Sequence, residues 1–143
     1  MKQFNLPRDG RLPLRFTGTV LAESAGHFWR GREHNRYYNL TLYETKGGRF
    51  VVHWNYRTQW EGEDHHSDAQ ECASLVECAI ALEEFDPTFW VVAFKPVIAS
   101  YRGHEAGEEY TARQKELERG IKERYRAQVS ELCQTLDVAE EIE

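Results

Sequence analysis

The chain has 143 residues, 41% of them hydrophobic and 29% charged, which is enough for one domain with a single core. No apolar run approaches the roughly 20 residues that a helix needs to span a bilayer, and the N-terminus lacks an apolar signal segment. Three cysteines do not make a disulfide framework, so we expect a cytoplasmic protein without a membrane partner.

The net charge of −6 is unevenly distributed. Residues 1–60 hold ten Lys and Arg against four Asp and Glu, whereas residues 61–143 hold eight against twenty. This imbalance fits an ordinary solvated surface, a molecule whose ends meet partners of opposite charge, or head-to-tail self-association.

The N-terminal third predicts one strand between two irregular segments. Residues 1–13 are interrupted by prolines and a glycine, which predicts an extended lead-in. Residues 14–23 (LRFTGTVLAE) predict a first strand, in which Gly18 indicates a bulge or a neighbour packed closely over the backbone. Residues 24–35 predict a loop rich in basic and aromatic side chains.

The strongest local signal is a hairpin over residues 36–61, where two alternating runs flank Lys-Gly-Gly. A two-residue loop would set leucines among polar side chains, because directly paired residues share a face. A three-residue loop at 46–48 unites the apolar side chains and gives Gly48 a positive φ. It pairs Leu42 with Val52, Leu40 with Trp54 and Tyr38 with Tyr56.

Part of this region resembles a known family. Residues 15–18 (RFTG), 21–23 (LAE) and 42–52 (LYETKGGRFVV) are similar to a pattern in small bacterial proteins of the uncharacterised EXLDI type. The resemblance covers roughly residues 14–53 and rests on strand and turn residues. It implies no activity.

The C-terminal half predicts helices and one further strand. Residues 62–68 form a polar loop whose Ser67 or Asp68 can cap a helix over 69–83. Residues 89–95 predict a strand covered on both faces, with 97–101 as an edge continuation. Residues 108–136 predict one helix too long for a globule of this size, which must therefore overhang, bend or pack on a second copy.

We therefore predict an α+β fold. Its antiparallel sheet has four to five strands with the hairpin 36–61 at the centre, one packed helix (69–83) and one long C-terminal helix (108–136). Residues 1–105 form the core domain, residues 106–136 a helix partly packed on it, and residues 137–143 an acidic tail.

Two surfaces are candidates for binding. The polar face of the sheet and the adjoining loop combine arginines with aromatic rings, the materials of single-stranded nucleic-acid platforms. The predicted binding residues are Arg15, Trp29, Arg30, Arg32, Tyr37, Asn39, Tyr43, His53, Asn55 and Arg57. An apolar stripe on the long helix predicts self-association through Ile121, Tyr125, Val129, Leu132 and Leu136.

Catalytic and cofactor chemistry have little support. The chain lacks a P-loop, a G-x-S-x-G, an H-E-x-x-H and a dinucleotide fingerprint, so we predict no catalytic residues and no cofactor. The one metal-like group does not have the paired ligand spacing of a zinc site, so we predict no metal. That group consists of His53, Glu63, Asp64, His65, His66, Asp68 and Cys72.

These observations favour a non-enzymatic protein that binds another macromolecule. We expect a small bacterial, phage or mobile-element accessory protein whose partner is another protein or a second copy in a homodimer. Single-stranded nucleic-acid binding through the sheet face is the first alternative, and a metal-dependent hydrolase is the second.

Overall fold

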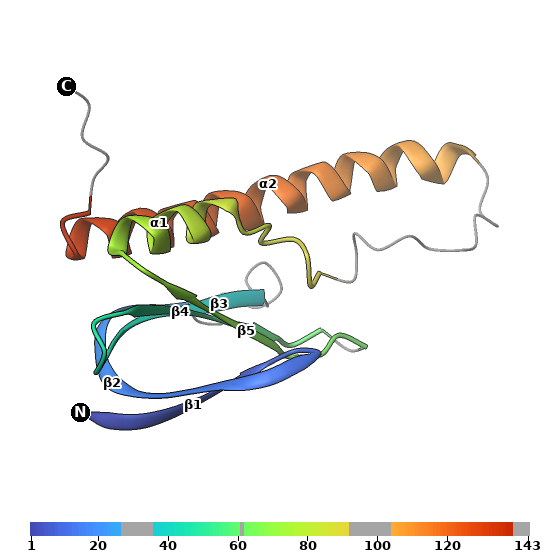
Figure 1. Cartoon of the computed structure of the whole chain (residues 1–143). Coiled ribbons are helices and arrows are strands. Elements are labelled where there is room, and N and C mark those ends of the chain that lie inside the picture. Colours follow the sequence, from blue (N-terminus) through green and yellow to red (C-terminus); the bar gives the residue numbers. More distant parts are fainter. Residues whose placement is uncertain (27–35, 61, 92–103, 139–143) are drawn as a thin grey trace.

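The computed structural model describes residues 1–26, 36–60, 62–91 and 104–138, without the side chains of 104–111. A five-stranded antiparallel sheet in the order β1-β2-β3-β4-β5 carries two helices, which confirms the α+β fold (Figure 1). The elements are β1 (Lys2–Arg8), β2 (Arg11–Ala25), β3 (Arg36–Thr45), β4 (Phe50–Thr58), β5 (His66–Cys72), α1 (Leu75–Glu84) and α2 (His104–Thr135).

The hairpin of β3 and β4 has the predicted register. Leu42 pairs with Val52, Leu40 with Trp54 and Tyr38 with Tyr56. The loop is residues 46–48, and its Gly48 has a φ of 80°. All six side chains of the apolar face are buried, so the alternation of the two arms was sufficient to fix their pairing.

The N-terminal lead-in is a strand instead. β1 pairs with the first half of β2, from Lys2 opposite Gly18 to Leu6 opposite Leu14. Pro7 lies at a shift in the pairing register between Leu6 and Arg8, on an outer strand, where a missing backbone N–H is tolerated. The prolines of this segment therefore interrupt the ladder without preventing it.

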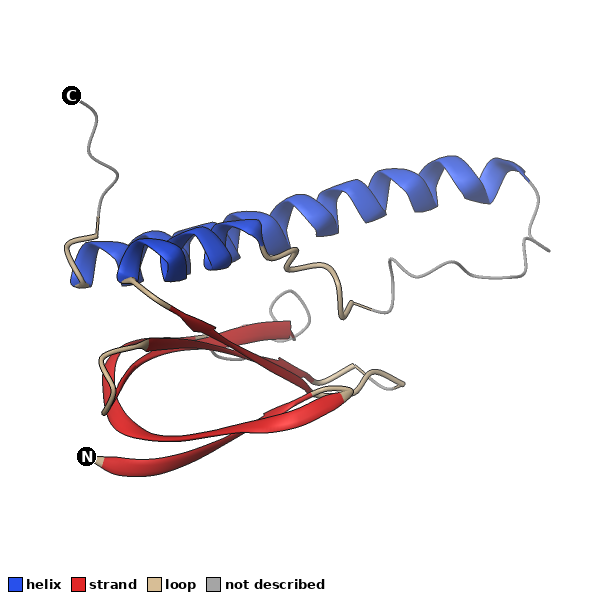
Figure 2. Cartoon of the chain, viewed as in Figure 1, coloured by secondary structure: helices blue, strands red, loops and turns tan. Residues whose placement is uncertain are grey.

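The sheet curls until its first and last strands meet (Figure 2). Asp9 N donates to Ser67 O at 2.9 Å, which joins the β1–β2 turn to β5. Gly18 lies so close to β3 that a Cβ there would be 2.2 Å from Glu44 O, as its position in the strand predicted. An inner apolar cluster fills the curl: Phe4, Leu6, Leu14, Phe16, Tyr43, Val51 and Ala69.

The predicted helix over 69–83 begins too early. Residues up to Cys72 belong to β5, whose Ala69 is fully buried, and α1 starts after Ser74. Ser74 Oγ accepts from Glu77 N at 3.1 Å, and Glu77 Oε2 accepts from Ala73 N at 2.7 Å. This Ser-x-x-Glu pattern marks the true helix start.

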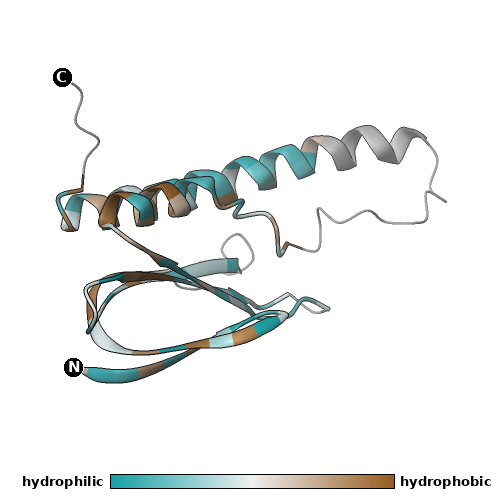
Figure 3. Ribbon diagram, in the orientation of Figure 1, coloured by the Kyte–Doolittle hydropathy of each residue, from teal (hydrophilic) through white to brown (hydrophobic). Residues whose placement is uncertain are grey.

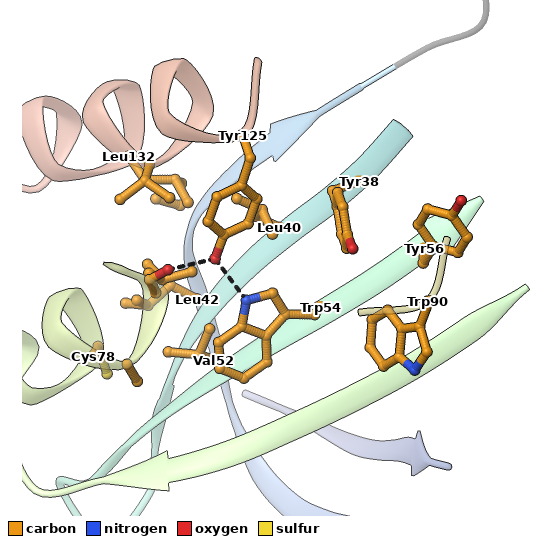
Figure 4. Close-up of a cluster of buried hydrophobic side chains, with 14 of the residues drawn as sticks. Tyr38, Leu40, Leu42, Val52, Trp54, Tyr56, Cys78, Trp90, Tyr125 and Leu132 are labelled. Carbon is orange, nitrogen blue, oxygen red and sulfur yellow. Dashed lines mark hydrogen bonds between the residues drawn. The ribbon is translucent and has the colours of Figure 1, made fainter. Parts of the chain in front are cut away.

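Both helices cover the outer face of the sheet, where the main core lies. Trp54 Nε1 donates to Tyr125 Oη at 3.0 Å, and Tyr125 Oη donates to Leu82 O at 2.6 Å (Figure 4). Tyr125 of α2 therefore connects the sheet to α1 through two hydrogen bonds. Burial of the hairpin's apolar face against the helices provides most of the apolar contact in the fold.

Helix α2 has 32 residues, about 48 Å at 1.5 Å per residue, and its N-terminal part extends beyond the sheet. Apolar positions concentrate toward its C-terminal half (Figure 3). The predicted helix over 108–136 is therefore confirmed, with a start four residues earlier and an end one residue earlier, and of the three alternatives the structure has the overhang. Among the described residues, no helix is both long enough and apolar enough to cross a membrane.

The predicted strand over 89–95 is only partly described. Residues 87–90 form a turn, in which the Trp90 ring stacks on His66 with a centroid distance of 5.3 Å. The remaining residues of that strand and the edge 97–101 lie outside the described residues.

Candidate binding site between strand β3 and helix α2

Part of the polar sheet face predicted to bind lines the curl. Tyr43 is buried against Phe4 and Phe16, at centroid distances of 4.7 and 5.3 Å. His53 is also buried, at 7% exposure. The expectation of one open Tyr/Arg platform is therefore wrong, because β1 and β2 fold over the part of this face that Tyr43 and His53 occupy.

The other predicted platform residues are divided between surfaces. Arg15 lies on the opposite side of β2 from Phe16, with Nε 3.3 Å from Asn5 Oδ1. Tyr37, Asn39, Asn55 and Arg57 are half-buried at the far end of the hairpin. Arg57 Nη1 donates to His65 Nδ1 at 2.8 Å, so this arginine is committed to the loop before β5.

The predicted loop residues Trp29, Arg30 and Arg32 lie outside the described residues.

The predicted self-association stripe belongs to the chain's own core. Ile121, Tyr125, Val129 and Leu132 are 2–6% exposed, and Leu136 packs against the same cluster. Side chains that are buried against the sheet are not available for a dimer seam. The prediction that this stripe forms a homodimer is therefore corrected: its side chains pack within one chain.

The metal-like group of the sequence is dispersed. Glu63 bonds Arg36, His66 bonds Asp9, and Asp68 bonds Arg11. Among the described residues, no three His, Cys, Asp or Glu side chains are placed to hold one metal ion.

Cys72 and Cys78 do not share a helix, because Cys72 ends β5 while Cys78 lies in α1. Both thiols are buried, and burial raises the pKa of both. A thiol with a raised pKa is a poor nucleophile, so these are packing residues.

His53 closes the curl with a buried hydrogen-bond chain. Ser67 Oγ donates to Pro7 O at 2.8 Å, so His53 Nε2, which lies 2.8 Å from Ser67 Oγ, must donate to it. These two hydrogen bonds join β4, β5 and β1. Burial, helped by the charge of Arg57 and opposed by Asp68, lowers the pKa of His53 to about 4.

This shift makes stability depend on pH. Between pH 6.5 and 4 an unfolded histidine binds a proton that native His53 does not, so the free energy of unfolding falls as pH falls through this range. We expect His53 to contribute a loss of roughly 2–4 kcal/mol. In urea titrations at several pH values, His53→Gln, which keeps an N–H donor, removes this part of the pH dependence. The exposed His65→Gln keeps it, and equal pH profiles for His53→Gln and wild type would refute the assignment.

A cavity of about 250 Å³ lies where the end of β2 and the start of β3 meet α2. Its wall on the sheet side includes Ser24, Gly26, Arg36 and Tyr37. Its wall on the helix side consists of Ile121, Arg124, Tyr125, Ala127, Gln128 and Glu131. The cavity is open to solvent and combines two arginines with aromatic side chains.

One of the two arginines is held by a buried ion pair. Arg36 Nε and Nη2 each lie 2.9 Å from a Glu63 oxygen, and the two side chains are 8% and 2% exposed. Tyr56 Oη also donates to Glu63, and Trp60 covers the guanidinium at 4.8 Å. Burial alone would raise the pKa of Glu63, but these hydrogen bonds and the Arg36 charge outweigh it and lower the pKa.

The other arginine, Arg124, has no such counter-ion. It is half-buried, and no carboxylate among the described residues lies within 4 Å of its guanidinium nitrogens. Burial and the nearby charge of Arg36 both lower its pKa. Gly120, one turn earlier, leaves room for Arg124 Nη1, which would lie 3.3 Å from a Cβ at that position.

Gln128 fixes the helix side of the cavity. Its Nε2 donates to Ser24 O at 3.2 Å and to Tyr38 O at 2.9 Å. These bonds join α2 to the backbones of β2 and β3, so Arg124, one turn before Gln128, has a fixed position over β3. The site is preformed and cationic.

No sequence pattern marks Arg36, Glu63 and Arg124 as one site. Glu63 is distant from Arg36 in the chain, and Arg124 stands among many charged residues of a helix. The usable signal was Gly120 four residues before Arg124, because a glycine inside a long helix indicates close approach of another group.

Comparisons with known proteins found no match: no family model, no curated protein and no solved structure matches the chain.

Proposed function

We propose that the protein is a non-enzymatic binding protein whose partner is another protein, docked over the cavity between β3 and α2. The observation that carries the proposal is the half-buried guanidinium of Arg124, which has no ion-pair partner among the described residues, in a preformed cavity. Arginines in such positions are typical anchors of protein interfaces. Leaving one beside a second arginine is costly unless a partner supplies the missing negative charge.

The buried cysteine, tyrosine and histidine side chains with shifted pKa values support binding over catalysis. Burial keeps the three cysteine thiols protonated by raising their pKa, and it keeps His53 neutral. Tyr38, Tyr56 and Tyr125 likewise have raised pKa values because they are buried. A nucleophile or general base needs the opposite arrangement, with a pKa near neutrality and access to substrate.

The same geometry favours a protein over the other candidate partners. The apolar stripe of α2 is used inside the chain, which leaves no seam for a homodimer there. A nucleic acid would meet a molecule of net charge −6, and Tyr43, one of the rings predicted to stack with bases, lies inside the curl. An acidic segment of a protein requires one local cationic site, which Arg124 provides.

Matched variants on α2 test the proposal. Arg124→Gln removes the cationic group, while Arg126→Gln removes an exposed arginine that lines the other side of α2. Each protein serves as bait in lysate of the source cells, with and without nuclease. A retained protein is then purified and titrated by calorimetry.

We expect a partner that binds wild type and Arg126→Gln alike and binds Arg124→Gln about 30-fold or more weakly, since losing one side of a buried charge pair costs roughly 2 kcal/mol or more. Equal binding to all three baits contradicts the proposal. Retention that nuclease abolishes shows a nucleic-acid partner instead.

A further inference from the structure

We infer that this cavity takes a single carboxylate, from an acidic side chain of the partner, held by Arg124 with help from Arg36. The inference deepens the proposed function and rests on it for the source of the carboxylate. It concerns the chemistry of the bound group, which small probes can test without the partner.

The donors of the cavity are guanidinium N–H groups. Glu63 accepts from Nε and Nη2 of Arg36, which leaves the other N–H groups of this guanidinium for further partners. Arg124 makes no ion pair with the described residues, so its planar fork is open. A carboxylate matches that fork with two parallel hydrogen bonds.

The charge balance selects an anion with one negative charge. Among the described residues, Arg36 and Arg124 carry two positive charges and Glu63 carries one negative charge, so the buried part of the site has an excess of one positive charge. A carboxylate neutralises this excess. A phosphate monoester, with a charge of about −1.5 to −2, would leave the site negative beside Glu63. Glu131 also lines the cavity but is exposed, so solvent screens most of its charge.

The size and walls of the cavity favour a side chain as the source. A volume of about 250 Å³ is below the roughly 300–1,000 Å³ of typical small-molecule sites. Free C-terminal carboxylates are usually captured by backbone N–H groups, whereas arginine clusters recognise acidic motifs. Here the sheet backbone presents the carbonyls of Ser24 and Tyr38, which Gln128 already occupies.

The first test follows the arginine Nε–Hε NMR signals of the full chain during titration with acetate, inorganic phosphate or chloride at equal ionic strength. We expect saturable shifts of the Arg124 signal with acetate, and about tenfold weaker binding of phosphate. Arg124→Gln should lose the acetate response of the remaining Arg36 signal, whereas Arg126→Gln should keep it. No saturable shift, or tighter binding of phosphate than of acetate, overturns the inference.

The second test separates the sources of the carboxylate with three blocked peptides. Acetyl-Gly-Glu-Gly-amide offers a side-chain carboxylate, acetyl-Gly-Gln-Gly-amide offers none, and acetyl-Gly-Gly-Gly offers a terminal one. We expect the Glu peptide to bind at least as tightly as acetate and the Gln peptide not to bind. Tighter binding of the free-acid peptide overturns the side-chain source.

The outcomes also separate this inference from the proposed function. Binding of acetate and the Glu peptide, with no protein partner that depends on Arg124, supports the carboxylate site and contradicts the proposed protein partner. A partner that depends on Arg124 but competes with neither acetate nor the Glu peptide supports the proposed function and overturns the carboxylate.

Discussion

Glu63→Gln is expected to lower the free energy of unfolding by roughly 3–5 kcal/mol, the usual result of removing one partner of a buried ion pair. Glu63 and Arg36 are 2% and 8% exposed, and two hydrogen bonds of 2.9 Å join them. Glutamine keeps the shape and an oxygen for Tyr56, so the change isolates the charge. Without the Glu63 carboxylate, the Arg36 guanidinium is buried near Arg124, and no ion pair among the described residues compensates its charge.

Urea denaturation at pH 7 measures this loss, and Glu71→Gln is the matched control. Glu71 pairs with Arg49 at 2.8 Å, but both side chains are about half exposed, at 49% and 51%. Solvent screens that pair, so we expect less than about 1 kcal/mol there. Similar small losses in both variants would show that Glu63 is not buried as described.

The second large effect is expected at Leu132, where alanine should cost about 2–5 kcal/mol. Leu132 is 2% exposed and belongs to the core that α2 forms with the sheet and α1. Its removal leaves a void under the C-terminal half of α2. Thermal and urea unfolding measure the loss, and the cooperativity of the transition should be retained.

Leu12→Ala is the control for this variant, because Leu12 is 82% exposed and should change stability by less than about 0.5 kcal/mol. If α2 instead packed mainly on another molecule, the loss at Leu132 would depend on protein concentration. A constant loss over a hundredfold range of concentration supports the intramolecular packing.

The centre of the fold was predictable because the alternation of apolar residues within β3 and β4 determines how the two strands pair. In the hairpin, only the three-residue loop puts Leu40 beside Trp54 on an apolar face, and the structure has this register. A different signal, a glycine inside a strand, predicted a bulge or a close neighbour at Gly18, and the structure has the close neighbour. Alternation over two adjacent strands carries enough information to fix their pairing.

The ends of the sheet were not predictable in this way. β1 contains a proline and β5 consists of the weakly strand-forming residues HSDAQEC, so local preference disfavours both. Their strand state depends on closure of the curl, where Ser67 and Asp9 exchange bonds across the first and last strands. Tertiary contact overrides propensity there, and the predicted binding face became an interior.

The candidate site depends on a different tertiary contact, the docking of α2 on the sheet. Arg36 and Arg124 are 88 positions apart in the numbering, and only the docking of α2 on β3 brings them to one cavity. A sequence pattern does not show that two residues so far apart in the chain lie close together in space. The predicted stripe on α2 is apolar as expected, and in the structure its side chains pack into the chain's own core.

The most direct test of the central claim is a double-mutant cycle between Arg124 and the acidic residue of a captured partner. It combines Arg124→Gln with a Glu→Gln or Asp→Asn change in the partner, and calorimetry gives the four affinities. A charge pair in contact predicts a coupling energy of roughly 1.5 kcal/mol or more, so the double variant binds better than the sum of single losses implies. Additive losses at every acidic position of the partner would contradict the claim that Arg124 receives a carboxylate.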